Sequence, residues 1–274
     1  MKLSISVRIA EGFLSKEESI LTLSQVTELA HNAGYQAICM RASQVGIQSS
    51  AEQIADAQGH LAKNEIGVSM MTGDFDVVYN NEKGPNCLRN ITPYLDLAEK
   101  LNTDMIRVAL KKEDDISSAQ KAADEALERN IRLVHQCHTL SLFETLDGIE
   151  QTLKKIDRKN FGLIYEPANL EICGQPYGVE SIERLAPWIF NVYFQNQKLK
   201  PEGAITLETW CRGPISFDLI QIHDPGGIDF DVVFEGLSKI GYDQTVTVHQ
   251  SAPEGGSPIE SATATANFLK QKMP

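Results

Sequence analysis

The feature that most constrains the fold is a series of short apolar runs, rich in β-branched residues, spaced about 30 residues apart, the length of a βα unit. Segments with helical periodicity separate these runs. Several runs lack polar–apolar alternation, as expected of parallel strands that are covered on both faces. We predict eight strands, at Leu3–Ile9, Ala37–Arg41, Ile66–Met71, Met105–Leu110, Ile131–Val134, Phe161–Glu166, Ile189–Phe194 and Thr245–His249.

Strand–helix alternation along the whole chain implies right-handed crossovers and a parallel sheet. Eight strands favour closure into a barrel over an open, doubly wound sheet. The first run is not followed by a GxGxxG motif, so a nucleotide cofactor is not expected. We therefore predict an α/β fold, with residues 1–274 forming a single (β/α)8 TIM barrel domain.

Four segments predict helix starts, because each has a serine followed three positions later by Glu or Gln, the pattern of a capping box. They are Ser15–Glu18, Ser50–Gln53, Ser141–Glu144 and Ser257–Glu260. Pro258 also suits the first position of a helix, where its missing N–H group is not needed.

The interval between the seventh run, which ends at Phe194, and a helix expected near Asp229 is much longer than the other connections. Long loops in compact domains are usually functional or disordered. Apolar residues such as Trp210, Phe217 and Leu219 indicate an ordered excursion. Because it follows a strand, this loop is expected on the catalytic face of the barrel.

Charge and cysteine content limit the partners and the location. The net charge is −12 and the isoelectric point about 5.0, which argues against binding to a nucleic acid. The five cysteines show no CxxC spacing, which indicates a reducing compartment. We find no signal peptide and no run of membrane-spanning length, so we expect a cytoplasmic protein without a membrane partner.

Chemistry in such barrels sits where the strands end, and Glu166 ends the sixth run. Its carboxylate is a candidate metal ligand or acid/base group, although an ion-paired or capping carboxylate would also fit. His249 ends the eighth run and is a candidate ligand or general acid, or a hydrogen-bonded core histidine. His223, in the long loop, is a further candidate metal ligand.

Other polar residues fall on the same predicted rim and are candidates for substrate binding. Side chains alternate along a strand, so we expect Gln136 to face inward and His135 to face the helices. Arg41 and Arg107 suit recognition of an anion through the planar guanidinium group, although a salt bridge within the rim is an alternative. The full set of substrate-binding candidates is Gln136, His138, Asn169, Gln195, Asn196, Arg41 and Arg107.

The segments that carry these residues resemble the xylose-isomerase-like barrel superfamily, which contains sugar-phosphate isomerases, epimerases and the endonuclease IV type of apurinic endonuclease. The most specific stretch is Gly241–His249, which resembles the family's final strand, and Pro225–Phe230 resembles the helix start before it. Further resemblances lie in Leu133–His138, Phe161–Asn169 and Asn191–Lys198. The resemblance runs nearly from end to end.

The resemblance implies a divalent metal, which members commonly hold through two Glu, one Asp and one His. Carried over by position, the ligands become Gln136, Glu166, Tyr193 and His249, and only Glu166 keeps a carboxylate. A nitrogen-rich site of Glu166, His249 and either His223 or His138 would suit one Zn, Mn or Fe ion. Alternatively the metal is lost, and Glu166 and a histidine form an acid/base pair.

The function implied by the resemblance is that of a sugar or sugar-phosphate isomerase or epimerase, acting by proton abstraction next to a carbonyl group. A lyase or dehydratase on a sugar-derived substrate would share that first step. A non-catalytic carbohydrate-binding barrel is the other alternative, because a fold does not dictate a function. In each case the expected partner is a small carbohydrate.

Overall fold

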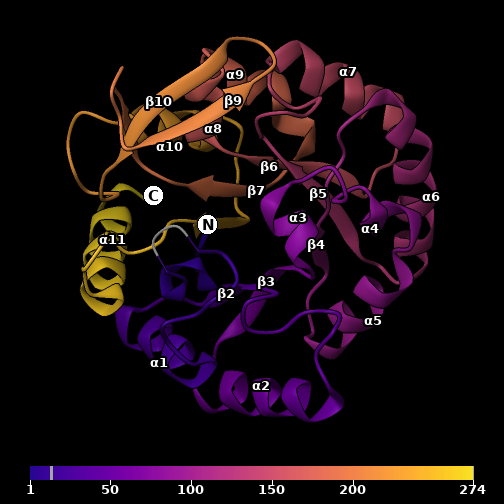
Figure 1. Cartoon of the computed structure of the whole chain (residues 1–274), viewed down its shortest axis with the longest axis vertical. Coiled ribbons are helices and arrows are strands. Elements are labelled where there is room, and N and C mark those ends of the chain that lie inside the picture. Colours follow the sequence, from indigo (N-terminus) through magenta and orange to yellow (C-terminus); the bar gives the residue numbers. More distant parts are fainter. Residues whose placement is uncertain (13–14, 274) are drawn as a thin grey trace.

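Eight parallel strands close into a barrel, in the order β1-β11-β7-β6-β5-β4-β3-β2, and helices surround it (Figure 1). The computed structural model describes residues 1–12 and 15–273. The predicted (β/α)8 barrel is therefore confirmed. Its strands are β1 (Lys2–Ser6), β2 (Ala37–Arg41), β3 (Gly67–Thr72), β4 (Met105–Arg107), β5 (Arg132–Gln136), β6 (Phe161–Tyr165), β7 (Ile189–Phe194) and β11 (Thr245–Val248).

Two strands end three residues before the ends that we predicted from their apolar runs. The first ends at Ser6, whose hydroxyl accepts a hydrogen bond from the backbone N–H of Arg8 and caps the 3-10 helix η1 (Val7–Ala10). The fourth ends at Arg107, although the buried run continues to Leu110. Both differences arise because apolar residues beyond the strand end are buried by the loop that follows, so hydrophobicity does not mark the end of pairing.

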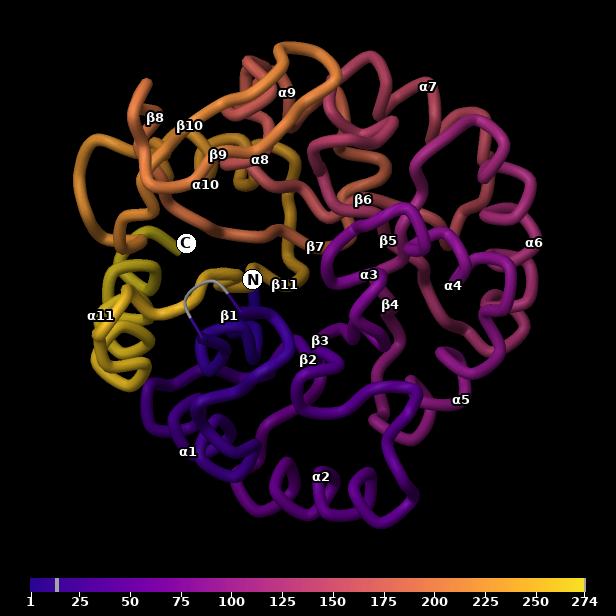
Figure 2. The backbone as a smooth tube through the Cα atoms, viewed as in Figure 1, coloured from indigo at the N-terminus to yellow at the C-terminus, as the bar shows by residue number. Residues whose placement is uncertain are grey.

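The helices that cover the barrel follow the strands in chain order (Figure 2). The C-terminal helix α11 closes the ring, because Lys270 donates to the carbonyl oxygen of Ala33, at the end of α1, at 2.9 Å. The described α-helices are α1 (Leu23–Ala33), α2 (Ala51–Lys63), α3 (Phe75–Tyr79), α4 (Asn86–Arg89), α5 (Thr92–Lys100), α6 (Ile116–Glu128), α7 (Leu146–Ile156), α8 (Pro167–Ile172), α9 (Val179–Leu185), α10 (Phe230–Lys239) and α11 (Pro258–Lys272). Two short 3-10 helices, η2 (Glu113–Asp115) and η3 (Ala186–Trp188), precede α6 and β7.

Two of the four predicted helix starts are confirmed. Ser50 forms a capping box with Gln53, and Ser257 caps α11, with Pro258 at its first position. The other two are wrong. Ser15 accepts hydrogen bonds from two following N–H groups, but α1 begins later, behind a capping box of Thr22 and Gln25.

The fourth predicted start, at Ser141, fails because its partner Glu144 binds elsewhere. Helix α7 begins at Leu146, capped by Thr145. The Glu144 carboxylate instead accepts hydrogen bonds from the backbone N–H groups of Leu140, Trp210 and Cys211. A carboxylate in this position ties the loop after β5 to the long interval after β7.

That long interval is ordered, as predicted, and contains its own antiparallel sheet. We call residues 195–229 the excursion. Its strands are β8 (Gln197–Leu199), β9 (Ile205–Thr209) and β10 (Gly213–Leu219), with β10 in the middle. Side chains alternate across this sheet, so Thr206 and Ser216 pair through their hydroxyls at 2.7 Å on one face.

Side chains from the strands fill the interior of the barrel below its mouth. A separate apolar cluster there consists of Cys39, Met70, Met105, Val134, Ile164 and Tyr193. Polar side chains complete the interior on the side of β1, β7 and β11, where Thr247 donates to Asn191 at 3.2 Å. Within residues 1–12 and 15–273, we find no helix with both the length and the apolar character to cross a membrane.

Candidate active site

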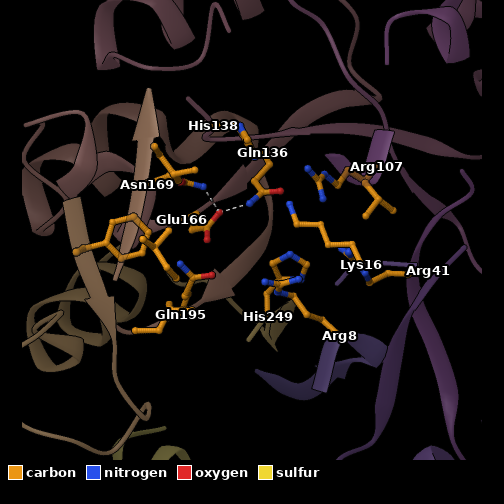
Figure 3. Close-up of a pocket in the computed structure, with 15 residues that line it drawn as sticks. Arg8, Lys16, Arg41, Arg107, Gln136, His138, Glu166, Asn169, Gln195 and His249 are labelled. Carbon is orange, nitrogen blue, oxygen red and sulfur yellow. Dashed lines mark hydrogen bonds between the residues drawn. The ribbon is translucent and has the colours of Figure 1, made fainter. Parts of the chain in front are cut away.

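A cavity of about 170 Å³ opens at the carboxyl ends of the strands, where the βα loops meet. The barrel side of its wall is polar, and Figure 3 shows several charged side chains there. Six of the barrel strands, β1, β2, β4, β5, β6 and β11, contribute to this wall, either from the strand itself or from the residues shortly after it. The residues are Arg8, Arg41, Arg107, Gln136, His138, Glu166, Asn169 and His249.

Glu166 directly follows β6 and occupies the N-cap position of α8, with Pro167 at the first helical position; its side chain makes no capping hydrogen bond. Its side chain is almost completely buried. Oε2 accepts hydrogen bonds from the side-chain amides of Gln136 and Asn169, the latter at 2.6 Å. No described residue bonds to Oε1, which points toward Gln195 and His249 in Figure 3. One oxygen is thus fixed and the other is free to act.

Burial dominates the electrostatics of Glu166. It raises the pKa of the carboxyl to about 7, against the opposing effects of the Gln136 amide and the positive charge of Arg107. A buried carboxylate is costly because low-dielectric surroundings disfavour its charged form. Glu166 can therefore change its protonation state close to neutral pH.

His249 directly follows β11 and stacks on the ring of Tyr193, with centroids 4.0 Å apart. Burial, reinforced by the charges of Arg41 and Arg8, holds the pKa of His249 well below its usual range, so the ring is neutral. Its Nδ1 has no hydrogen-bond partner among the described residues, and neither does Oε1 of Gln136. Unpaired polar atoms beside a cavity are expected where a polar ligand or water completes the hydrogen bonding.

Gln136 lines the cavity while His135 turns away and stacks on Phe143 at 4.0 Å, so the alternation predicted for the fifth strand is confirmed. His138 also lines the cavity, and its Nδ1 lies 2.9 Å from the amide nitrogen of Asn80. Burial, followed by the charge of Arg107, holds the pKa of His138 well below its usual range. His138 therefore offers a neutral ring.

Arg41 is held by a buried carboxylate. Its Nε and Nη2 donate to the two oxygens of Glu11 at 2.7 and 3.1 Å, a bidentate pair. Arg8 lies 3.4 Å from the same carboxylate. The salt bridge that the sequence left open for Arg41 is thus formed, with a partner located just after η1.

Arg107 has no such partner. It is buried, lines the cavity, and makes no hydrogen bond or ion pair with any residue in 1–12 or 15–273. Burial is the main cause that lowers the pKa of Arg107, and the nearby charge of Arg41 lowers it further. Its guanidinium group is therefore a buried cation of the wall without an ionic partner in the described chain.

The cavity also contains two cations that the sequence analysis missed, Arg8 and Lys16. Arg8 was hidden inside a run predicted as strand, although it lies just beyond the true end of β1. Lys16 falls in a segment predicted as the start of a helix. Burial, with the charges of Arg8 and Arg41, lowers the pKa of Lys16 to about 7. Arg8 would have been a candidate if the end of β1 had been predicted correctly, because site residues in such barrels lie where the strands end.

The excursion forms the apolar side of the cavity. Ile205 and Leu207 from β9, and Phe217 and Leu219 from β10, line it. These side chains share one face of the small sheet, opposite the face that carries Thr206 and Ser216. Val78, from α3, adds to the apolar surface. The excursion therefore covers one side of a charged site with an apolar surface.

Eight of the ten predicted site residues line this cavity, namely Glu166, His249, Gln136, His138, Asn169, Gln195, Arg41 and Arg107. Asn196 does not: its side-chain oxygen accepts from the N–H groups of Gln197 and Ile228, and its amide donates to the carbonyl oxygen of Gln221. These contacts tie the two ends of the excursion together, which corrects the position expected for Asn196.

His223 was predicted as a metal ligand at this site, and that position is wrong. It lies exposed in a turn after β10 and is not part of the cavity wall. The structure therefore does not assemble Glu166, His249 and His223 into a ligand set. His138 does line the cavity with Glu166 and His249, but in the described chain these three side chains do not come close enough together to share an ion. Across residues 1–12 and 15–273, the group of His, Cys, Asp or Glu side chains close enough to share an ion is Glu144, Cys173 and Cys211, beside the turn of the excursion.

The cavity residues do not fit a divalent metal. Such an ion needs several oxygen or nitrogen ligands, with carboxylates supplying opposite charge. The lining offers one carboxylate, Glu166, and two amides already occupy one of its oxygens. Four cationic side chains, Arg8, Lys16, Arg41 and Arg107, face the same space and would repel the ion. Tyr193, at one of the carried-over ligand positions, is buried, with its hydroxyl 3.3 Å from Cys39 Sγ.

Solved structures with this fold include a probable 3-DHS dehydratase involved in petrobactin synthesis from Bacillus anthracis, 15% identical, with a TM-score of 0.73 over 98% of this chain and 99% of that chain. D-allulose 3-epimerase from Methylomonas sp., solved in complex with D-allulose, is 14% identical, with a TM-score of 0.73 over 99% and 97%. The IOLI protein, solved with a zinc atom, is 18% identical, with a TM-score of 0.71 over 98% and 96%. At these identities the likeness is one of fold.

No curated protein sequence matches the chain significantly. A family model does match, described as the xylose isomerase-like TIM barrel, and it covers residues 27–272. That range includes all the segments on which the resemblance in sequence was based. The chain belongs to the xylose isomerase-like TIM barrel family.

Proposed function

We propose that this protein is an enzyme that isomerises or epimerises a sugar or sugar phosphate, with Glu166 as the base that removes a proton next to a carbonyl group. The environment of Glu166 carries the proposal. The carboxylate is buried, its Oε2 is fixed by two amides, and its pKa is raised to about 7. A general base works best when its pKa lies near the working pH.

The first step breaks the C–H bond next to the carbonyl group, and Glu166 takes the proton. The electron pair forms a carbon–carbon double bond, so negative charge moves to the carbonyl oxygen. Cations such as Lys16 and Arg107 favour this negative charge, because they line the same cavity. Gln136, with its unpaired Oε1, and the neutral His249 are available to the sugar hydroxyls.

The second step decides the product. Return of the proton from Glu166 to the former carbonyl carbon, together with transfer of the neighbouring hydroxyl proton to the former carbonyl oxygen, gives an isomer. Delivery of a proton by another acid to the opposite face of the original carbon, with the carbonyl group restored, gives an epimer. The fold shared with an epimerase that was solved in complex with D-allulose supports a sugar substrate.

A lyase is a second candidate, and Lys16 favours it. In a lyase the same enolate expels a hydroxyl group from the next carbon, and that group must take a proton as it leaves as water. Burial and neighbouring guanidinium groups lower the pKa of Lys16 to about 7, so its ammonium group gives up a proton readily. The fold shared with a probable 3-DHS dehydratase agrees with this candidate.

The test is exchange of the proton next to the carbonyl group with solvent. The protein and its Glu166→Gln variant are incubated in D2O with a panel of sugars, sugar phosphates and sugar acids, and NMR follows deuterium incorporation and product. We expect exchange with one class of compound, lowered at least about a hundredfold in Glu166→Gln. Glu208→Gln, at an exposed position of β9, is the matched control and should leave exchange unchanged.

Two outcomes would contradict the proposal. Saturable sugar binding by the unaltered protein, without exchange or turnover, would favour a carbohydrate-binding barrel instead. Exchange that survives undiminished in Glu166→Gln would remove Glu166 as the base.

A further inference from the structure

The cavity has more positive than negative charge, although the whole chain is acidic. Four cationic side chains line it, and the carboxylates available to them are Glu166 in the wall and Glu11 behind it. Even with both carboxylates ionised, two positive charges are uncompensated. In a chain of net charge −12, this local excess is opposite in sign to the rest of the molecule.

The excess positive charge lies mainly on Arg107 and Lys16, because Glu11 already pairs with the other two cations, Arg41 and Arg8. Both oxygens of Glu11 bind Arg41, and Arg8 shares one of them. Neither Arg107 nor Lys16 makes a hydrogen bond or ion pair in the described part of the chain. Arg107 is buried, whereas Lys16 is half-buried and its ammonium group lies 5.2 Å from the centre of the Tyr79 ring. A buried charge without a partner, such as that of Arg107, is unfavourable, so its retention at a cavity indicates that an anion binds there.

The other carboxylate, that of Glu166, makes no ion pair with Arg107 or Lys16 either. Gln136 and Asn169 hold Glu166 on the β6 side of the cavity, and Figure 3 shows Arg107, Lys16 and Arg8 on the other side. A ligand between the two sides would therefore have its anionic end against the cations and its uncharged part near Glu166. The apolar side chains of Ile205 and Phe217 lower the local dielectric and strengthen that attraction.

The chemistry of these cations limits the kinds of ligand that the cavity can bind. The planar fork of a guanidinium group matches the oxygens of a carboxylate or a phosphate, and an ammonium group adds a charge without fixed geometry. A cavity of about 170 Å³ admits a small molecule rather than a polymer.

We propose that the substrate is a small acidic sugar derivative, bearing a carboxylate or phosphate group, and that Arg107, Arg8 and Lys16 bind this group opposite Glu166 without a metal ion. The inference rests on the proposed function in one respect, the position of Glu166 as base beside the uncharged part of the substrate. It adds the class of substrate and the residues that select it.

The experiment measures binding by calorimetry at low ionic strength, with EDTA present. The probes are D-ribose 5-phosphate, D-ribonate and inorganic phosphate, with neutral D-ribose as the reference. We expect at least one anion to bind at least about tenfold more tightly than D-ribose. The Arg107→Met and Lys16→Met variants should each weaken that binding by at least about tenfold.

Lys198→Met is the matched control, because Lys198 is exposed on β8 and outside the cavity. It should leave binding unchanged, and circular dichroism should verify that all variants fold. Tighter binding of D-ribonate assigns a carboxylate, and tighter binding of D-ribose 5-phosphate assigns a phosphate; both support the proposal. The proposal is overturned if no anion binds more tightly than D-ribose, or if Arg107→Met and Lys16→Met bind it as well as the unaltered protein.

The two proposals fail in different ways. Anion binding that depends on Arg107, without proton exchange on any compound, would support the anionic ligand and contradict the isomerase. Exchange on neutral sugars that is insensitive to Arg107→Met would support the isomerase and contradict the anionic substrate.

Discussion

Asn169 donates a hydrogen bond to Oε2 of Glu166 at 2.6 Å, from one turn further along the chain. The same amide donates to the carbonyl oxygen of Cys137, just after β5, at 2.8 Å. Asn169 therefore fixes the carboxylate relative to the neighbouring strand. Its hydrogen bond also favours the charged form of Glu166, against the burial that raises the pKa.

Removing this donor should shift the pH profile of the enzyme. In Asn169→Ala we expect the pKa of Glu166 to rise further, so the acidic limb of the kcat/KM profile should move up by about one pH unit. Asn32→Ala, at an exposed position of α1, is the control. A profile that stays in place while the rate falls would give Asn169 a role in substrate binding instead.

Replacing Glu166 should stabilise the fold in alkaline solution. The folded-state pKa of Glu166, about 7, lies above its ordinary 4.5, so protonation stabilises the fold below 4.5 and this contribution is lost as the pH rises to about 7. Glu166→Gln keeps an oxygen that accepts from Gln136 and Asn169 but carries no charge. Its free energy of unfolding should therefore exceed that of the unaltered protein by about 3 kcal/mol near about pH 8, and by less than about 1 kcal/mol near about pH 5.

Urea denaturation at the two pH values measures this difference. Equal stability of the two proteins near about pH 8 would mean that burial does not penalise the Glu166 carboxylate as the structure indicates.

Arg41 and Arg107 should respond oppositely to loss of charge. Arg41→Met leaves the buried carboxylate of Glu11 without its bidentate partner, so the free energy of unfolding should fall by about 3 kcal/mol. Arg107→Met removes a buried charge that has no partner in the described chain, so stability should hold or rise by about 1 kcal/mol. Thermal and urea denaturation measure both. A large loss of stability in Arg107→Met would reveal a partner for its charge within the protein.

Glu144 should hold the excursion over the cavity. Its carboxylate accepts hydrogen bonds from the backbone of Trp210 and Cys211, in the turn between β9 and β10. Glu144→Ala should destabilise this turn by about 2 kcal/mol, and hydrogen–deuterium exchange should quicken in residues 205–219 while the barrel strands stay protected. Glu208→Ala is the control. Uniform loss of protection would show that Glu144 supports the whole fold rather than the excursion.

Divalent ions should not stabilise the cavity. Mn²⁺ or Mg²⁺ prefers several oxygen ligands, whereas Glu166 is the one carboxylate lining the cavity in the described chain. We expect the melting temperature to be unchanged by either ion or by EDTA. Zn²⁺ could bind Glu144, Cys173 and Cys211 instead, so any effect of Zn²⁺ should be repeated in Cys211→Ser. A rise in melting temperature with Mn²⁺ that Glu166→Gln abolishes would contradict the absence of a metal site.

The barrel follows from local signals in the sequence. Apolar runs such as Phe161–Tyr165 are buried on both faces, and their number and spacing leave few alternatives to a closed parallel sheet. Glu166 could be identified for the same reason, since the end of its strand is marked by a change from apolar to polar residues and by Pro167. Where the apolar run continues beyond the end of the strand, as it does around Arg8, the sequence does not show where the strand ends.

Only the tertiary structure decided which side chains meet. Asn196 and Gln195 are neighbours in sequence, but one binds the backbone of the excursion and the other faces the cavity, because the chain turns there to begin β8. Arg8 and Lys16 join Arg107 through loops whose paths depend on contacts far along the chain. Local propensity cannot specify these contacts, since they form between residues that come together when the barrel closes. The sequence alone therefore determined the barrel and the position of Glu166 at the end of its strand. The tertiary structure decided that several cations, among them Arg8 and Lys16, line the same cavity as Glu166.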